Sequence, residues 1–265
     1  MRSSGWCLTD DVEDFLVRAG GFLRARPAEH VMQLTWAERV RVRGVGAFGR
    51  APVFGVLEED GEVSGTFYHL PPRALGLSPL TPAQADSLAA HLAGTGLSPA
   101  SVGADHDTAA AFAEAWHRRT GVAAKLRDVR VRLYRLGTLT PPEPSPEGRA
   151  RVLGEGDLGQ AVFWCGEFAR AVGEDVTIDA VSIAGMNPLI GGQIQVDIVY
   201  TPAHLRGHGY AAAVSAEVSR AALAAGAQEV VLFADRSNPT SNALYQRLGY
   251  RPLSDWSGYD FASVE

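Results

Sequence analysis

The spacing of hydrophobic residues alternates between the period of a helix and that of a strand, which indicates an α/β protein. Residues 11–24 place apolar side chains at helical spacing, with acidic residues in the first turn. Residues 53–57 and 63–69 are rich in β-forming side chains, and the pair Asp60-Gly61 between them is typical of a hairpin turn. This part of the chain is therefore expected to form a helix and a β-hairpin.

The remaining elements are expected in an alternating order. Further strands are predicted at residues 75–77, 101–103, 129–136, 193–200 and 229–234, and further helices at 82–92, 107–120, 158–172, 210–225 and 240–248. Thr81 before Pro82 is the expected N-cap of its helix. The order of hairpin and then β-α-β-α-β is expected twice, so we predict an α/β fold, a mixed sheet with flanking helices, and hypothesise an internal duplication.

A proline-rich segment divides the chain near its middle. Residues 140–148 hold four prolines, and such a segment can continue neither a helix nor a central strand. It is predicted to be an extended linker. The expected domains are therefore residues 1–139 and 149–265, joined by the linker at 140–148.

The composition is that of an ordinary globular protein, with 46% hydrophobic and 20% charged residues among 265. A net charge of -6 argues against a nucleic-acid partner, because binding phosphates needs a basic face. Cys7 and Cys165 form no disulfide or zinc pattern, and His204 and His208 lack a third metal ligand nearby. With no apolar run long enough for a signal peptide or a membrane span, a cytoplasmic protein without a metal is expected.

The most informative segment runs from residue 199 to 211, where a strand leads through a short polar loop into a helix start. The first N–H groups of a helix have no internal acceptor and carry the positive end of its dipole, so they can bind phosphate oxygens. Gly207 and Gly209 lack a Cβ that would hold a phosphate away, and Arg206 adds a cation. Residues 206–211, called the helix-start loop below, are therefore a candidate pyrophosphate site.

The nucleotide that this site would hold has two readings. Gly207, Gly209 and Ala212 also fit the dinucleotide pattern G-x-G-x-x-G/A, and Asp235 follows at the end of the next predicted strand. However, residues 201–206 separate the strand from the first glycine, and about 30 residues remain after Asp235, too few for further βαβ units. NAD(P) binding is therefore kept only as an alternative.

The same segment resembles the acyl-CoA-binding motif of the GNAT superfamily of N-acetyltransferases, [QR]-x-x-G-x-[GA] after a strand. Arg206, Gly209 and Ala211 fill its defined positions, and a second signature of the superfamily follows in NPTSNALYQRLGY, with Asn238, Tyr245, Gly249 and Tyr250. Residues 77–81 of the first half lack the motif. The picture that the resemblance implies is two GNAT-like domains in tandem, a degenerate N-terminal one and an acetyl-CoA-binding C-terminal one.

The resemblance also implies how coenzyme A would be held. The strand at 193–200 would diverge from its neighbour, and the backbone of Ile198, Val199 and Tyr200 would pair with the pantetheine arm. Asn238 would hydrogen-bond the pantetheine or the helix backbone, although a turn and cap role is an equal alternative. The helix-start loop would hold the pyrophosphate through Arg206, Gly207, His208, Gly209, Tyr210 and Ala211.

Candidates for acid–base chemistry are uneven in strength. Tyr245 matches the tyrosine that protonates the leaving thiolate in many members, with a core aromatic as the alternative. The family position for a glutamate base falls on Gln193, which cannot accept a proton usefully. Asp197, expected on the same face as Gln193 and Val199, is the leading candidate base. Glu167 and a water chain are the alternatives.

These observations predict an acetyl-CoA-dependent N-acyltransferase, most simply an acetyltransferase, acting on a primary amine of a small molecule or peptide by direct attack. The first alternative is a CoA-binding regulatory module without catalysis, and the second is an NAD(P)-binding protein. No nucleic acid, membrane or metal is expected as a partner. The sequence indicates neither the acceptor nor the oligomeric state.

Overall fold

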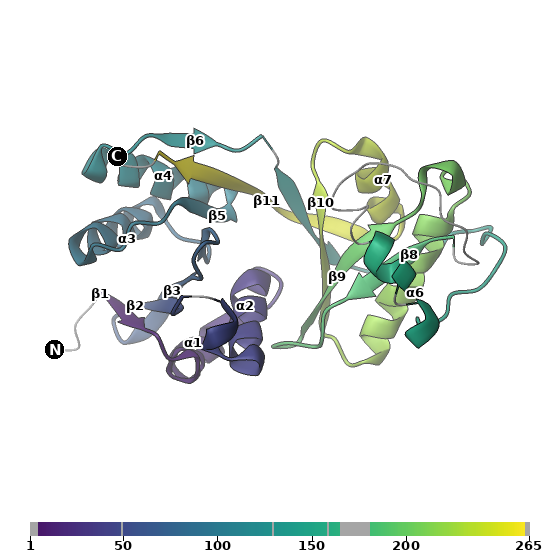
Figure 1. Cartoon of the computed structure of the whole chain (residues 1–265), viewed down its shortest axis with the longest axis horizontal. Helices are drawn as coiled ribbons and strands as arrows, with labels where there is room; N and C mark the ends of the chain where they lie inside the picture. The colour runs from purple at the N-terminus through teal and green to yellow at the C-terminus, as the bar shows by residue number, and fades with distance from the viewer. Residues whose placement is uncertain (1–4, 49, 129, 158, 165–180, 263–265) are drawn as a thin grey trace. The chain divides into compact units, whose positions relative to one another are not determined.

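The structure, a computed structural model, describes residues 5–262 except 49, 129, 158 and 165–180, and it is a mixed α/β protein (Figure 1). It consists of two compact units. Unit 1 comprises Met1–Leu133, Asp235–Ser237 and Leu253–Glu265, and unit 2 comprises Tyr134–Ala234 and Asn238–Pro252. The predicted fold class, a mixed sheet with flanking helices, is confirmed.

Unit 1 contains a β-hairpin, four long helices and further short strands. Its elements are β1 (Gly5–Thr9), α1 (Val12–Ala25), α2 (Val31–Arg43), η1 (Val45–Phe48), β2 (Val53–Glu59), β3 (Glu62–His69), β4 (Leu75–Leu77), α3 (Pro82–Thr95), β5 (Ser101–Asp105), α4 (His106–Thr120) and β6 (Ala124–Leu126). The strand order is β1-β2-β3-β4-β5-β11, and β6 also pairs with β11. Helix α2 and strands β1 and β6 were not predicted from the sequence.

Local sequence signals explain where the elements of unit 1 begin and turn. The Asp11 side chain accepts hydrogen bonds from Glu13 N and Asp14 N and so caps α1. Asp60 and Gly61 adopt the positive φ values of 53° and 86° that the predicted hairpin turn requires. Thr81 caps α3 in a reciprocal capping box with Gln84. The predicted α1, the hairpin and the Thr81 cap are all confirmed.

The described strands of unit 2 pair in the order β11-β7-β10-β9-β8. Its elements are β7 (Val131–Leu136), η2 (Glu155–Asp157), β8 (Ile183–Met186), β9 (Gln193–Tyr200), η3 (Ala203–Leu205), α6 (Tyr210–Ala224), β10 (Glu229–Asp235), α7 (Pro239–Arg247) and β11 (Tyr250–Phe261). The predicted strand–helix–strand–helix series from residue 193 to 248 is confirmed. Most of the helix predicted at 158–172 lies outside the described residues.

The core of unit 2 lies between its sheet and helices α6 and α7. Ile194 and Val196 of β9 pack with Val230 and Leu232 of β10 on this face. The rest of this core comes from Ala216 and Ala222 of α6, Tyr245 of α7, Leu248 just beyond it, Tyr134 of β7 and Tyr250 of β11. Burial of these apolar surfaces is the main force that holds the unit together.

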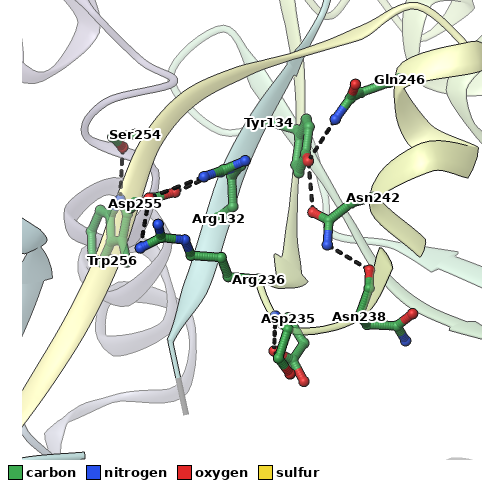
Figure 2. Close-up of polar contacts among 11 residues, drawn as sticks. Arg132, Tyr134, Asp235, Arg236, Asn238, Asn242, Gln246, Ser254, Asp255 and Trp256 are labelled. Carbon is green, nitrogen blue, oxygen red and sulfur yellow. Dashed lines mark hydrogen bonds and ion pairs between the residues drawn. The ribbon is translucent and has the colours of Figure 1, made fainter. Parts of the chain in front are cut away.

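Strands β7 and β11 each run through both units. Of β7, residues up to Leu133 belong to unit 1 and Tyr134 onward to unit 2, while β11 passes from unit 2 to unit 1 after Pro252. Within unit 1, Arg132 of β7 donates from two guanidinium nitrogens to the two carboxylate oxygens of Asp255 on β11, at 2.6 and 3.1 Å (Figure 2). The hydrogen bonds from Arg132 lower the pKa of the Asp255 carboxyl. The units thus interleave along the sequence, and independent domains at 1–139 and 149–265 stay a prediction.

Deleting everything before Pro141 is expected to leave unit 2 unable to fold. The deletion removes Tyr134, which is fully buried, together with Leu136 and Leu139, which pack against the same core. At ~2–5 kcal/mol for each large core side chain, these losses together with the missing strand β7 cancel most or all of the ~5–15 kcal/mol by which a domain is stable. Fragment 141–265 should show no cooperative thermal transition by circular dichroism. A transition as sharp as that of fragment 130–265, which keeps β7, would contradict this.

Candidate functional site

Strands β9 and β10 separate part-way along their length. They pair in parallel at four positions, from Gln193 with Glu229 to Val196 with Leu232. Both strands continue, β9 to Tyr200 and β10 to Asp235, without further pairing between them. The backbone groups of residues 197–200 that face away from β8 are therefore available to a ligand, because backbone N–H and C=O groups otherwise demand partners.

A bulge accompanies this separation. Ala184 of β8 pairs with Val199, and Met186 pairs with Val196. The paired positions are therefore three residues apart along β9 but two residues apart along β8, which defines a β-bulge. The extra residue lies at Asp197 or Ile198, and Val199 packs against the core of Ile194 and Val196. The expected common face of Asp197 and Val199 is therefore wrong, because a bulge reverses the alternation beyond it. Asp197 itself is exposed.

The helix-start loop presents free backbone donors. Gly207 and Gly209 both have φ of +84°, in the left-handed region that favours glycine, and Gly209 is the N-cap of α6 without a side-chain cap. The first helical bond runs from Ala213 N to Gly209 O at 3.1 Å. Among the described residues, the N–H groups from Gly207 to Ala212 have no acceptor. Together with the helix dipole they form a site suited to an anion.

Two side chains brace this loop. Arg206, which is exposed, donates from Nε to the carbonyl of Thr201 at 3.1 Å. The His208 ring lies with Nδ1 2.9 Å from the carbonyl of Arg206 and stacks on Tyr210 at 5.7 Å between ring centroids. These contacts fix the loop and leave the outer guanidinium nitrogens of Arg206 for an anion. The predicted roles of Arg206, Gly207, His208, Gly209, Tyr210 and Ala211 stay predictions.

Tyr245 lies in the core of unit 2 with 9% of its surface exposed. Its ring packs between those of Tyr134 and Tyr250, at centroid distances of 6.3 and 6.0 Å. Burial raises the pKa of the Tyr245 phenol to about 12, and the neighbouring Tyr250 adds to the rise. The hydroxyl makes no hydrogen bond to the part of the chain that the structure describes. A neutral phenol without a protein partner is a group that holds a proton for donation.

Asn238 is the N-cap of α7, and its Oδ1 accepts from Ser241 N at 3.1 Å. The cap role expected as one alternative is confirmed. A contact with pantetheine stays a prediction.

The described residues at the candidate base positions differ in burial. Gln193 is fully buried, and neither atom of its amide has a hydrogen-bond partner among the described residues. Asp197 is exposed at the bulge, and Glu167 lies outside the described residues. Trp164, 4% exposed, packs against Tyr200 at the end of β9, at 5.9 Å between ring centroids. Asp197 is thus the one described carboxylate on β9.

A hydrogen-bonded group of side chains next to Tyr245 was not predicted from the sequence. Figure 2 shows Tyr134 of β7 directed at Asn242 and Gln246 of α7, and Asn242 bonded onward to Asn238. Nothing in the local sequence signals this group, because Tyr134 lies in a strand before the linker and more than 100 positions from its partners. Only pairing of β7 inside the sheet of unit 2 brings them together.

Residues 184–257 match the family model described as FR47-like protein. A GCN5-related N-acetyltransferase from Sphaerobacter thermophilus is similar over 96% of this chain and 94% of its own, with a TM-score of 0.55 and 18% identity. The chain has the GNAT fold. An acetyltransferase of the GNAT family from Colwellia psychrerythraea covers 97% of this chain and 99% of its own, with a TM-score of 0.56 and 10% identity.

A GCN5-related N-acetyltransferase from Kribbella flavida is similar over 76% of this chain and 87% of its own, with a TM-score of 0.52 and 17% identity. No curated protein matches the sequence. The resemblance to the GNAT superfamily is confirmed at the level of fold, and the first half as a degenerate copy stays a prediction.

In the part of the chain that the structure describes, none of the helices has the length and hydrophobicity of a membrane-spanning segment. Nor do the described residues contain a group of three or more histidine, cysteine, aspartate or glutamate residues placed to hold a metal ion.

Proposed function

We propose that this GNAT-fold protein transfers an acetyl group from acetyl-CoA to a primary amine of a small molecule or peptide. The observation that carries the proposal is the separation of β9 from β10 beside the free donors of the helix-start loop. An extended amide-bearing arm can pair with the open edge of β9 while its diphosphate binds at the start of α6. This combination fits the pantetheine and pyrophosphate of coenzyme A.

The residues around this site have distinct tasks. The N–H groups from Gly207 to Ala212 and the Arg206 guanidinium neutralise the pyrophosphate. The open backbone of Ile198, Val199 and Tyr200 aligns the thioester by pairing with the amides of the arm, and so turns a bimolecular reaction into one between held groups. A backbone N–H at the bulge stabilises the oxyanion that forms on the thioester carbonyl.

The chemical step is a direct attack that needs one proton removed and one supplied. The amine nitrogen forms a bond to the acetyl carbon, and the carbon–sulfur bond breaks with its electron pair on sulfur. Tyr245 gives its phenolic proton to this thiolate. A phenol is protonated at physiological pH even at its ordinary pKa of ~10, and burial, which raises the pKa of Tyr245 to about 12, keeps it so. Asp197, acting through water because it is exposed, accepts the proton lost by the amine. That proton returns to Tyr245 through solvent.

The decisive experiment measures free thiol release from acetyl-CoA in the presence of a broad panel of primary amines. Thiol release that depends on both the amine and the enzyme, with the acetylated amine seen by mass spectrometry, is the expected result. An enzyme that binds CoA by calorimetry but releases no thiol with any amine would overturn the proposal.

The second candidate function is that of a CoA-binding module without catalysis. Gln193 favours it, because a glutamine occupies the strand position from which a carboxylate base would act in some members of the superfamily. CoA binding without thiol release is its signature in the same experiment. The NAD(P) alternative finds no comparable support, since β8 and β9 are antiparallel and the fold is not doubly wound.

Substituting Asp197 by asparagine is expected to lower kcat/KM at neutral pH about tenfold. The loss stays below the ~10²-fold typical of a direct base because a water molecule transmits the proton. The pH profile of the variant should follow the pKa of the free amine alone. Glu217→Gln, which changes an exposed carboxylate on α6 paired with Arg220, is the matched control. An Asp197→Asn enzyme as active as this control would exclude Asp197 as the base.

A titration of the intact chain should saturate at one CoA per chain. The corresponding helix start of unit 1, at α3, offers fewer free donors: Gln84 N already donates to the Thr81 side chain, and Pro82 has no N–H. Residues 77–81 also lack both glycine and arginine. Calorimetry that resolves two equivalent CoA sites would contradict this expectation.

A further inference from the structure

Helix α7 carries Tyr245 but is weakly anchored by itself. It has nine residues, and Tyr245 is its single buried residue. A helix this short is not stable alone in water, so its contacts with the rest of unit 2 decide its position and its rotation about its axis. Any group that fixes α7 therefore also fixes the direction of the Tyr245 hydroxyl.

Tyr134 is such a group. It is fully buried, its ring contacts that of Tyr245, and its hydroxyl donates to Asn242 Oδ1 at 2.6 Å. The same hydroxyl accepts from Gln246 Nε2 at 3.4 Å. Asn242 and Gln246 lie one turn apart on α7, and Tyr245 lies between them in sequence. One hydroxyl thus holds two successive turns of the helix (Figure 2).

The contact extends to the first turn of α7. Asn242 Nδ2 donates to the carbonyl of Asn238 at 2.6 Å, so both ends of the Asn242 amide are engaged and its orientation is set. Asn238 in turn caps the helix through Ser241 N. A partly buried chain of hydrogen bonds of this kind is stronger and more directional than the same bonds in water.

We propose that Tyr134 is a positioning residue for Tyr245, acting through the hydrogen bonds Tyr134–Asn242–Asn238 and Tyr134–Gln246; the proposal rests on the acetyl transfer described above. Tyr134 touches no reacting atom. Its hydroxyl sets the rotation of α7 and hence where Tyr245 delivers its proton, and its ring keeps water from that phenol. The residue comes from the strand before the proline-rich segment, so the acid on α7 depends on a part of the sequence outside its own half.

The test is a double-mutant cycle in the full-length enzyme. Tyr134→Phe keeps the ring and removes the hydroxyl, and it should lower kcat about tenfold with less than a twofold change in KM for acetyl-CoA. In the Tyr245→Phe background the same change should alter kcat by less than about twofold, because the residue it positions is gone. A structural role would give the same loss in both backgrounds, and that result overturns the proposal, as does an unchanged kcat for Tyr134→Phe.

The matched control is Ser219→Ala. Ser219 and Tyr250 share a buried hydrogen bond of 2.7 Å in the same core. The Tyr250 ring contacts that of Tyr245, but among the described residues neither of these two hydroxyls is hydrogen-bonded to α7. Ser219→Ala removes a tyrosine hydrogen bond comparable with the one that Tyr134→Phe removes, and kcat should stay within about twofold of wild type. A tenfold loss in this control would mean that general loosening of the core explains the Tyr134→Phe result, and would overturn the assignment. Should Tyr134→Phe fail to fold, Asn242→Ala breaks the same contact from the half-exposed side and carries the same expectations.

A readout independent of turnover separates this proposal from the proposed function. The absorbance of ionised tyrosine is followed against pH in Tyr134→Phe and in the double variant Tyr134→Phe, Tyr245→Phe. The two proteins differ only at position 245, so the difference between the two curves reports the ionisation of Tyr245. Without the Tyr134 hydroxyl, α7 is free to rotate and carries the Tyr245 phenol out from under the ring at position 134. The pKa of Tyr245 should therefore fall from about 12 toward the ordinary ~10 as the phenol is hydrated. A pKa unchanged from that of Tyr245 in the wild type overturns the positioning role. If instead the pKa falls but Tyr245→Phe has wild-type turnover, it is the acid role of Tyr245 that fails.

Discussion

Substituting Gly209 by valine is expected to weaken CoA binding by about 100-fold or more. Gly209 has φ of +84° and ψ of -2°, where a β-branched residue is strained by ~1–2 kcal/mol. The side chain would also stand where phosphate oxygens must approach the free N–H groups of the α6 start. Space in the protein is not the obstacle, since the nearest atoms to an added Cβ are those of Pro146 at 3.9 Å. Calorimetric titration with CoA measures the effect.

The matched control for this variant is Gly226→Val. Gly226 lies just beyond the other end of α6, has φ of +91°, and has no atoms within 4 Å of an added Cβ. It carries a comparable backbone strain without approaching the helix start. CoA affinity should therefore survive in this control while both variants lose similar stability. An intact Gly209→Val protein that binds CoA as tightly as wild type would show that the pyrophosphate site lies elsewhere.

Substituting Tyr245 by phenylalanine is expected to lower kcat by roughly 10²-fold while CoA affinity changes little, as expected for loss of a general acid. The ring and its packing against Tyr134 and Tyr250 remain. Because the hydroxyl has no hydrogen-bond partner among the described residues, its removal should leave the free energy of unfolding unchanged or raised. Steady-state kinetics together with urea denaturation separate the two effects, and a stable variant with wild-type turnover would return Tyr245 to a purely structural role.

The raised pKa of Tyr245 also predicts how its contribution to stability depends on pH. The folded value of about 12 lies above the unfolded value of ~10, so the folded state binds more protons between these two values. The contribution is therefore fully present below pH ~10 and is lost as the pH rises through 12. At neutral pH the phenol keeps its proton, which is the state the proposed acid requires.

The sequence by itself determined the local elements and the helix-start loop. Strand β9, helix α6, strand β10 and helix α7 lie within about one residue of their predicted bounds, because periodicity and caps are local properties that tertiary contacts did not override here. The left-handed conformations at Gly207 and Gly209 follow likewise from glycine itself.

Only the tertiary structure decided how the strands pair and where their pairing is interrupted or ends. The bulge between Val196 and Val199 and the end of pairing beyond Val196 depend on register with β8 and β10, which alternation along one strand cannot reveal. The hydrogen bond from Tyr134 to Asn242 joins two residues 108 positions apart, and it forms only because β7 joins the sheet of unit 2. Such non-local contacts are selected by burial of the whole core rather than by any short segment, and the proline-rich segment therefore divides the sequence without dividing the sheet.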